Sequence, residues 1–262
     1  MSEAYVMSAE MAEFYESTFV PALFAPWAHR LVDAAAVTSG TSVLDVACGT
    51  GVVARTAADR VGPAGSVVGV DLNEAMLGVA ERVRPDLEWR LGDACALPFD
   101  DGSFDVVLSQ AALMFVGDRA TALREMGRVS RADGRVAVQV PGRLTASPGY
   151  QALADVVARH AEPEVSELLG TYFAVGEPDL LVGLFETASL RIDRFDTWLG
   201  ATRLGSLDTF LAAELLPLAD RVDRAVRDRI VEDCRTALAP FVAADGTVNA
   251  PLEVQLIVAH RT

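Results

Sequence analysis

The residues with the clearest chemical meaning lie in two short stretches of the chain. Residues 43–51 read Val-Leu-Asp-Val-Ala-Cys-Gly-Thr-Gly, and Asp71 closes a second apolar run, Ser-Val-Val-Gly-Val-Asp. Each stretch joins an apolar strand to an acidic residue, and the first continues into a glycine-rich turn. This pattern is typical of the nucleotide-binding edge of an open α/β sheet.

The acidic residue before the turn bears on which nucleotide binds. Asp45 precedes Gly49 by four residues, at the end of the expected first strand. A carboxylate there repels a diphosphate held by the turn and the next helix N-terminus, but attracts a cationic amino-acid tail. S-adenosylmethionine has an ammonium, a sulfonium and no phosphate. We therefore expect S-adenosylmethionine as cofactor and S-adenosylhomocysteine as product.

A dinucleotide remains an alternative ligand for the same residues. The run Gly49-Thr50-Gly51-Val52-Val53-Ala54 also fits the dinucleotide pattern, and Asp71 lies at the expected offset. An NAD(P)-dependent oxidoreductase is thus a second hypothesis. The lack of any Lys in the chain argues against the short-chain reductases, which use a Tyr-x-x-x-Lys pair.

The hydrophobic pattern predicts an α/β protein with a Rossmann-like sheet. Short apolar runs alternate with helical segments, which indicates a parallel sheet covered on both faces. We expect seven strands, mostly parallel with the last antiparallel, over 42–47, 66–71, 87–91, 104–109, 135–140, 191–198 and 252–259. We expect helices over 8–20, 26–36, 51–60, 73–84, 118–130, 148–160, 177–188, 206–215 and 220–238.

Composition narrows the class of partner and the compartment. The net charge of −15 disfavours nucleic acid and anionic membranes. No apolar run approaches the roughly 20 residues that span a bilayer, and the acidic N-terminus lacks the features of a signal peptide. The three cysteines have no paired spacing, so we expect a cytoplasmic protein. Because all 22 basic residues are Arg, we expect a high-GC bacterial source.

These landmarks together resemble a class I S-adenosylmethionine-dependent methyltransferase, of the ubiquinone/menaquinone C-methyltransferase-like group that acts on small molecules. The resemblance covers residues 10–142 by motif. It is carried by Val43–Gly51, Val68–Met76, the run from Gly92 to Phe99, and Ser103–Gln110. It implies a Rossmann-like methyltransferase fold and a cofactor site formed by Tyr15, Trp27, Asp45, Ala47, Cys48, Gly49, Gly51, Asp71, Leu72, Met76, Asp93, Ala94, Ser109 and Gln110.

The resemblance also implies a role for most of these residues. Asp45 and the glycine turn would hold the methionine portion, and Asp71 would accept hydrogen bonds from the ribose hydroxyls. Leu72 and Met76 would flank the adenine, whose amino group and ring nitrogen would meet the Asp93 carboxylate and the Ala94 N–H.

At the methyl-donor end, the resemblance implies Ser109 and Gln110. Tyr15 and Trp27 from the N-terminal helices would close over the cofactor. The chain departs from the family at Ala47, where the first glycine of the motif is expected, so the turn must rely on Gly49 and Gly51.

Candidates for the chemistry and for the methyl acceptor come from other segments. His160 is the histidine best placed to act as a base or to contact substrate, although an exposed helix-end residue is the alternative. We expect the walls of the acceptor pocket to include Met114, Phe115, Tyr150 and Tyr172. His and Cys never occur at ligand spacing, so we expect no metal.

The domain organisation follows from these elements. We expect an N-terminal helical cap (1–40), a cofactor-binding core (41–142) and the rest of the sheet (143–262). Two apolar insertions, 143–176 and 199–250, follow strands five and six and would form a lid at the ligand edge. The predicted function is methyl transfer to a small, largely apolar metabolite or natural-product intermediate. A non-catalytic S-adenosylmethionine-binding module is the other alternative, and the oligomeric state is not predicted.

Overall fold

The structure is a computed structural model that describes residues 8–218 and 221–262. The N-terminal residues used above to argue against a signal peptide, and residue 220 of the last predicted helix, lie outside the described part. The chain divides into two compact units. Unit 1 comprises residues up to Val140, with Pro178–Asp196 and Gln255–Thr262, and unit 2 comprises Pro141–Glu177 and Thr197–Val254. The predicted insertions 143–176 and 199–250 fall within unit 2, and their action as a lid stays a prediction.

In the described part of the chain, seven strands form one sheet in the order β3-β2-β1-β4-β5-β7-β6, with β7 antiparallel to the others. The predicted Rossmann-like methyltransferase fold is therefore confirmed. The strands are β1 (Ser42–Val46), β2 (Ser66–Asp71), β3 (Glu88–Leu91), β4 (Phe104–Gln110), β5 (Ser130–Pro141), β6 (Leu190–Leu204) and β7 (Val248–Arg261).

The register of the central strands places the candidate site at one edge of the sheet. Asp45 of β1 is in register with Gly69 of β2 and with Leu108 of β4. Because neighbouring strands are parallel, their carboxyl ends meet at one edge of the sheet, where open α/β sheets bind ligands. Residues at or just beyond these ends, such as Asp71 and Gln110, therefore lie at the same edge.

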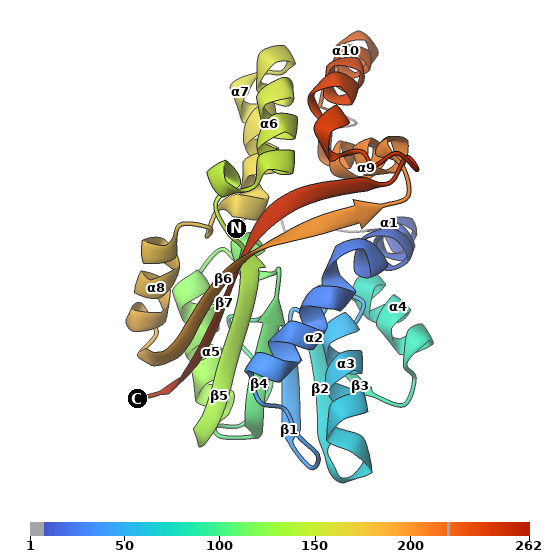
Figure 1. Ribbon diagram of the computed structural model, residues 1–262. Helices are drawn as coiled ribbons and strands as arrows, with labels where there is room; N and C mark the ends of the chain where they lie inside the picture. The colour runs from blue at the N-terminus through green and yellow to red at the C-terminus, as the bar shows by residue number, and fades with distance from the viewer. Residues whose placement is uncertain (1–7, 219–220) are drawn as a thin grey trace. The chain divides into compact units, whose positions relative to one another are not determined.

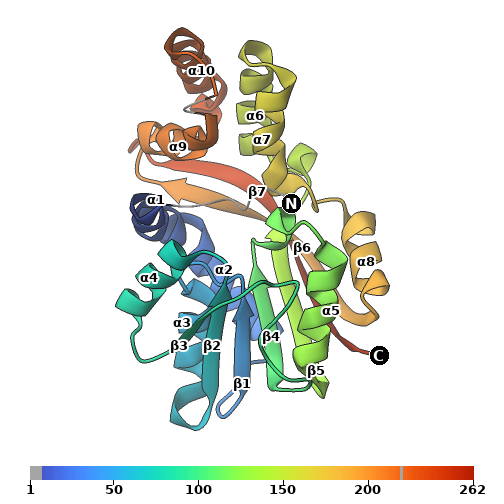
Figure 2. The same cartoon turned by 180° about the vertical axis from the view of Figure 1, so that it is seen from behind.

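Helices cover both faces of the parallel strands in unit 1. In the two opposite views of Figures 1 and 2, α2 and α3 lie on one face and α5 lies on the other. Asn73 and Asp118 cap α4 and α5 through side-chain bonds to backbone N–H groups. The α-helices are α1 (Ala9–Phe14), α2 (Ala25–Ala34), α3 (Val52–Val61), α4 (Glu74–Val83), α5 (Arg119–Val129), α6 (Pro148–His160), α7 (Pro163–Gly170), α8 (Pro178–Thr187), α9 (Leu207–Glu214) and α10 (Arg224–Ala237).

The N-terminal segment differs from the prediction of two separate helices. A ten-residue π-helix, η1 (Tyr15–Phe24), joins α1 directly to α2. Pro21 lies inside this segment and has no N–H to donate, which disfavours a regular α-helix at that point. The π-helix is rare in proteins and often marks functional sites. Here it carries Tyr15, one of the predicted cofactor residues.

The last two strands are longer than predicted. β6 continues to Leu204, beyond the expected end at residue 198, and β7 begins at Val248 rather than at 252. Gly200 and Pro251 lie in the added stretches and read as turn residues in the sequence. Pairing between strands overrides these local preferences, so part of the expected loop 199–250 is strand.

Candidate cofactor site

The glycine turn after β1 depends on left-handed backbone. Ala47, Gly49 and Gly51 have φ angles of 54°, 56° and 85°. Glycine adopts such angles freely, whereas alanine is strained there. The departure from the family pattern thus places an L-residue at a position that favours glycine. Gly51 N–H donates to the Cys48 carbonyl at 2.9 Å, which closes the turn at the start of α3.

The ring of Trp89 explains why two positions are glycine. A Cβ on Gly51 would lie 2.2 Å from Cη2 of Trp89, and a Cβ on Gly69 would lie 2.5 Å from its ring. The Trp89 indole N–H donates to the Arg84 carbonyl at 3.0 Å, which fixes the ring. The indole therefore packs directly on the backbone of β2 and of the turn.

Asp71 fastens the turn to the start of α4. Its Oδ2 accepts from the Gly49 N–H at 2.7 Å, and its Oδ1 accepts from the Asn73 N–H at 2.8 Å. Burial raises the pKa of the Asp71 carboxyl, and these backbone bonds oppose the rise. Each carboxylate oxygen has a second lone pair, so two further donors can be accepted.

Asp45 is enclosed by the fold. Its side chain is buried, and Oδ2 accepts from the Ala54 N–H at 2.9 Å in the first turn of α3. Burial raises the pKa of the Asp45 carboxyl to about 8, with the nearby Asp71 carboxylate adding to the rise. Asp45 thus anchors α3 behind the turn. Its predicted contact with a cationic tail stays a prediction.

Aromatic residues of the N-terminal segment lie beside the turn. A Cβ on Gly49 would lie 3.8 Å from Cε of Met76 and 4.0 Å from Cε1 of Tyr15. Tyr15 stacks on Phe24 with ring centroids 5.3 Å apart, and the buried Trp27 meets Phe24 edge-on. The structure thus brings Tyr15 and Met76 to the glycine turn, with Trp27 one ring further away.

Charges around Tyr15 show which carboxylates share this region. Burial raises the pKa of the Tyr15 phenol well above its usual range, and the carboxylates of Asp71, Glu16 and Asp45 raise it further. Asp45 and Asp71 were predicted from the strand pattern. Glu16 was not, because its only sequence signal is adjacency to Tyr15.

The residues predicted for the methyl-donor end and for the adenine follow the carboxyl ends of β2, β3 and β4. Ser109 is buried, and the Gln110 Nε2 donates to the Phe24 carbonyl at 3.0 Å. Leu72 is 56% exposed, so much of its side chain faces solvent. In the loop after β3, Asp93 Oδ1 accepts from the Cys95 N–H at 2.8 Å, with Ala94 between them.

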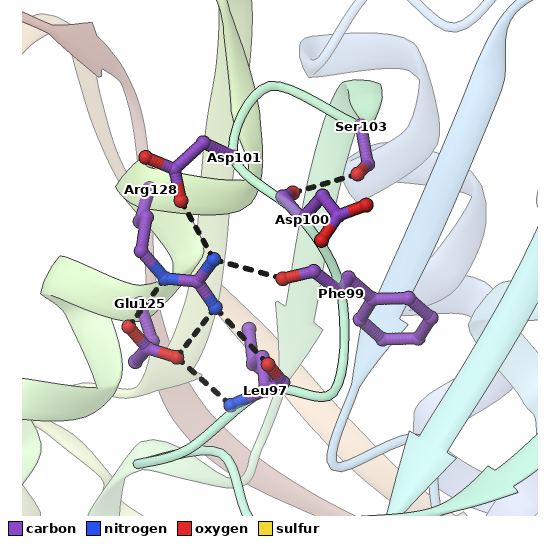
Figure 3. A network of polar contacts seen from close by, with 7 residues as sticks. All are labelled: Leu97, Phe99, Asp100, Asp101, Ser103, Glu125 and Arg128. Atoms are coloured by element: carbon purple, nitrogen blue, oxygen red, sulfur yellow. Dashed lines mark hydrogen bonds and ion pairs between the residues drawn. The ribbon is translucent and has the colours of Figure 1, made fainter.

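Arg128, which is partly exposed, holds the segment that follows Ala94 (Figure 3). The Arg128 guanidinium donates to the carbonyls of Leu97 and Phe99 and to the carboxylates of Glu125 and Asp101. Glu125 also accepts from the Leu97 N–H at 2.9 Å. These bonds fasten the loop to α5, and they place the Asp101 carboxylate in an ion pair.

Comparison with known proteins agrees with this geometry. Residues 44–138 match the family described as a methyltransferase domain, and this span includes most of β1, the turn, Asp71 and most of β5. Residues 44–138 are a methyltransferase domain. The predicted resemblance to class I methyltransferases is thereby confirmed for this span.

Two curated relatives extend the match beyond the domain. Nocamycin O-methyltransferase of Saccharothrix syringae is 34% identical over 178 residues, which cover 62% of this chain and 63% of the relative. A demethylmenaquinone methyltransferase of Renibacterium salmoninarum is 43% identical over 113 residues, covering 43% of this chain and 46% of the relative. The chain thus matches less than two thirds of the length of either enzyme.

The fold of the methyltransferase domain recurs in solved structures. A Bacillus halodurans C-125 protein with a provisional methyltransferase assignment superposes with a TM-score of 0.62 at 20% identity. The match covers 90% of this chain and 99% of that protein. At this identity the likeness establishes the fold alone.

The predicted acceptor-side residues divide between the methyltransferase domain and unit 2. Met114 is buried, whereas Phe115 is 44% exposed, and both follow β4 in unit 1. Tyr150 of α6 and Tyr172 belong to unit 2. The Tyr150 hydroxyl contacts the Thr202 hydroxyl at 2.6 Å and donates to Glu214 at 2.7 Å.

Glu214 is a buried acid in unit 2 that the sequence analysis missed. Burial raises the pKa of its carboxyl to about 7, and the Tyr150 hydroxyl partly offsets the rise. An acidic residue at the end of an apolar helical pattern carries no signal of burial. Its environment depends on Thr202, which lies on β6 far along the chain.

His160 has a protein partner. Its Nε2 lies 2.7 Å from Oδ2 of Asp233, a pair that links α6 to α10 within unit 2. The imidazole is therefore not simply an exposed helix end. Its predicted role as a base or substrate contact stays a prediction.

No group of three or more His, Cys, Asp or Glu side chains among the described residues could hold a metal ion. Within residues 8–218 and 221–262, no single helix is long and apolar enough to cross a membrane. One bent pair of helices, Pro163–Phe173 with Pro178–Thr187, reaches the length and apolar composition of a span only when the two are taken together.

Proposed function

We propose that the chain transfers the methyl group of S-adenosylmethionine to a small, largely apolar acceptor. The observation that carries this proposal is the position of Asp71 at the ligand edge of the sheet. Its carboxylate holds both the Gly49 and the Asn73 N–H groups and keeps lone pairs for two more donors. The ribose of an adenosyl cofactor offers two hydroxyls side by side. The methyltransferase domain match supports the same cofactor.

When bound, S-adenosylmethionine supplies an activated methyl group on a sulfonium. The chain then has to bind and orient, because effective rates in such displacements come from positioning. The Gly49 turn and Asp71 would hold the cofactor, while Tyr15 and Met76 would exclude water from it. Ser109 and Gln110, at the end of β4, would lie towards the acceptor. Transfer would give the acceptor a methyl group and release a proton from it, with S-adenosylhomocysteine as the other product.

The nature of the acceptor rests on the relatives and on the apolar composition of the predicted insertions. The two relatives reported above are named as methyltransferases of small molecules. The insertions 143–176 and 199–250 are rich in apolar residues, which favours a largely apolar acceptor. The proposed compartment is the cytoplasm, since Cys48, Cys95 and Cys234 are all free thiols.

The test is calorimetric titration of the wild type and of Asp71→Asn with S-adenosylhomocysteine. Two charge-assisted bonds to ribose, each worth roughly 1.5 kcal/mol, correspond to about 100-fold in Kd. Asp86→Asn is the matched control, because Asp86 is exposed and paired with Arg84. We expect wild-type affinity in the control and a loss of about 100-fold in Asp71→Asn. Unchanged affinity in Asp71→Asn would remove the assigned role.

Two further measurements separate the alternatives. Transfer of labelled methyl from S-adenosylmethionine into a bacterial metabolite extract would exclude a non-catalytic binding module. Enhanced fluorescence of NADH on titration with the protein would instead favour an oxidoreductase. We expect methyl transfer and no NADH enhancement, in keeping with the domain match.

A further inference from the structure

An ion pair links the N-terminal π-helix to the glycine turn. Arg55 of α3 donates through Nη1 to the Thr50 carbonyl at 2.8 Å and through Nη2 to Oε1 of Glu16 at 2.9 Å. The Arg55 and Glu16 side chains are 15% and 19% exposed. Arg55 therefore links the carboxylate of Glu16 to the turn that follows β1 through two hydrogen bonds.

The second oxygen of this carboxylate lacks a partner. Oε2 of Glu16 is buried and makes no hydrogen bond to any residue in the described part of the chain. A buried acceptor without a donor costs roughly 1–3 kcal/mol, and more when it is charged. A charged oxygen left in this state indicates that a donor from outside the protein completes it.

The surroundings of Glu16 identify the kind of donor. Glu16 is one of three carboxylates, with Asp71 and Asp45, that act on the Tyr15 phenol beside Gly49. Asp71 already holds two backbone N–H groups, and Asp45 is buried against Ala54. Arg55 is the cation that acts on the same phenol within the described residues, and its guanidinium occupies Oε1 of Glu16. Oε2 is thus an available anionic acceptor beside the turn.

We propose that Oε2 of Glu16 accepts a hydrogen bond from the α-ammonium of the methionine portion of the cofactor, with Arg55 holding the carboxylate in place. This assignment rests on the proposed function, because it names a residue for the same cofactor. The carboxylate that selects a cationic tail is then Glu16 of the π-helix rather than Asp45 of β1. The assignment also makes the amino-acid end of the ligand a contact of the N-terminal segment.

The experiment compares two ligands that differ in the amino-acid end. S-adenosylhomocysteine has the α-ammonium, whereas 5′-methylthioadenosine has the same adenosine and a thioether but no amino acid. Both are titrated calorimetrically into wild type, Glu16→Gln and Glu13→Gln. Glu13 is the matched control, because it lies in the same N-terminal segment and pairs with Arg82 at the surface.

For Glu16→Gln we expect the Kd of S-adenosylhomocysteine to rise tenfold or more, while the Kd of 5′-methylthioadenosine changes less than twofold. Glu13→Gln should match the wild type with both ligands. The assignment is overturned if Glu16→Gln leaves the first ligand's affinity unchanged, or if it weakens both ligands equally. Thermal melts of the variants report any loss of folding. A wild type that binds neither ligand would contradict the proposed function itself, which the Glu16 comparison does not.

Discussion

Replacing Asp45 by Asn should stabilise the ligand-free protein increasingly as the pH rises. The Asp45 carboxyl is 1% exposed, and burial raises its pKa from 3.8 to about 8. The folded protein therefore keeps a proton that the unfolded chain releases above pH 3.8. For a group with a raised folded pKa, the stabilisation is complete below the unfolded value and is lost as the pH rises towards the folded one.

The magnitude follows from the size of the shift. Each unit of difference in pKa corresponds to 1.36 kcal/mol, so the wild type should lose about 1.4 kcal/mol per pH unit from this group between pH 4 and 8. Asn has no titratable proton and keeps an oxygen that can accept from the Ala54 N–H. Between pH 5 and pH 7, Asp45→Asn should therefore gain about 2.7 kcal/mol on the wild type.

Urea unfolding of both proteins at pH 5, 6 and 7 measures this difference, and comparison with the wild type cancels the titration of all other groups. Asp33→Asn serves as the control, since the Asp33 carboxylate is exposed on α2. The control removes a carboxylate that the fold leaves exposed, and it reports what the loss of a surface charge does to stability. A difference between Asp45→Asn and wild type that stays constant within about 0.5 kcal/mol from pH 5 to pH 7 would refute a protonated, buried Asp45.

Two other substitutions test the turn and unit 2. Gly51→Ala places a Cβ 2.2 Å from the Trp89 ring at a φ of 85°, so thermal unfolding should show a loss of stability of roughly 2–5 kcal/mol. Gly78 lies in α4 with open space around it, so Gly78→Ala should gain up to about 1 kcal/mol of stability. Equal effects of the two would contradict the packing of Trp89. Burial raises the Glu214 pKa to about 7, and a Gln at this position can still accept from Tyr150. Between pH 4.5 and 7, the free energy of unfolding of Glu214→Gln in urea should therefore gain up to about 3 kcal/mol on that of the wild type. A gain independent of pH would show that Glu214 is already ionised in the fold.

The sequence was most informative where local pattern and sheet pairing agree. Short apolar runs bounded by glycine or acid marked β1, β2 and β4, and their carboxyl ends carry Gly49, Asp71 and Gln110. The caps Asn73 and Asp118 were also readable, because a capping side chain bonds to N–H groups only two or three residues away. Interactions over such short distances leave a signature in spacing.

The remainder depends on contacts between distant segments. The π-helix after α1 has no periodicity that separates it from an α-helix, and β6 and β7 pass through residues with turn character. Trp89 looked like one residue of a short strand, yet it determines why Gly51 is glycine. Glu16 and Arg55 are 39 positions apart, so no spacing in the sequence could connect them.

A crystal structure of the protein with S-adenosylhomocysteine would show where the ligand binds. We expect both ribose hydroxyls within hydrogen-bond distance of the Asp71 carboxylate and the amino-acid end beside the turn of Gly49 and Gly51. A ligand bound elsewhere, or a dinucleotide whose diphosphate rests on the backbone of that turn, would contradict this expectation.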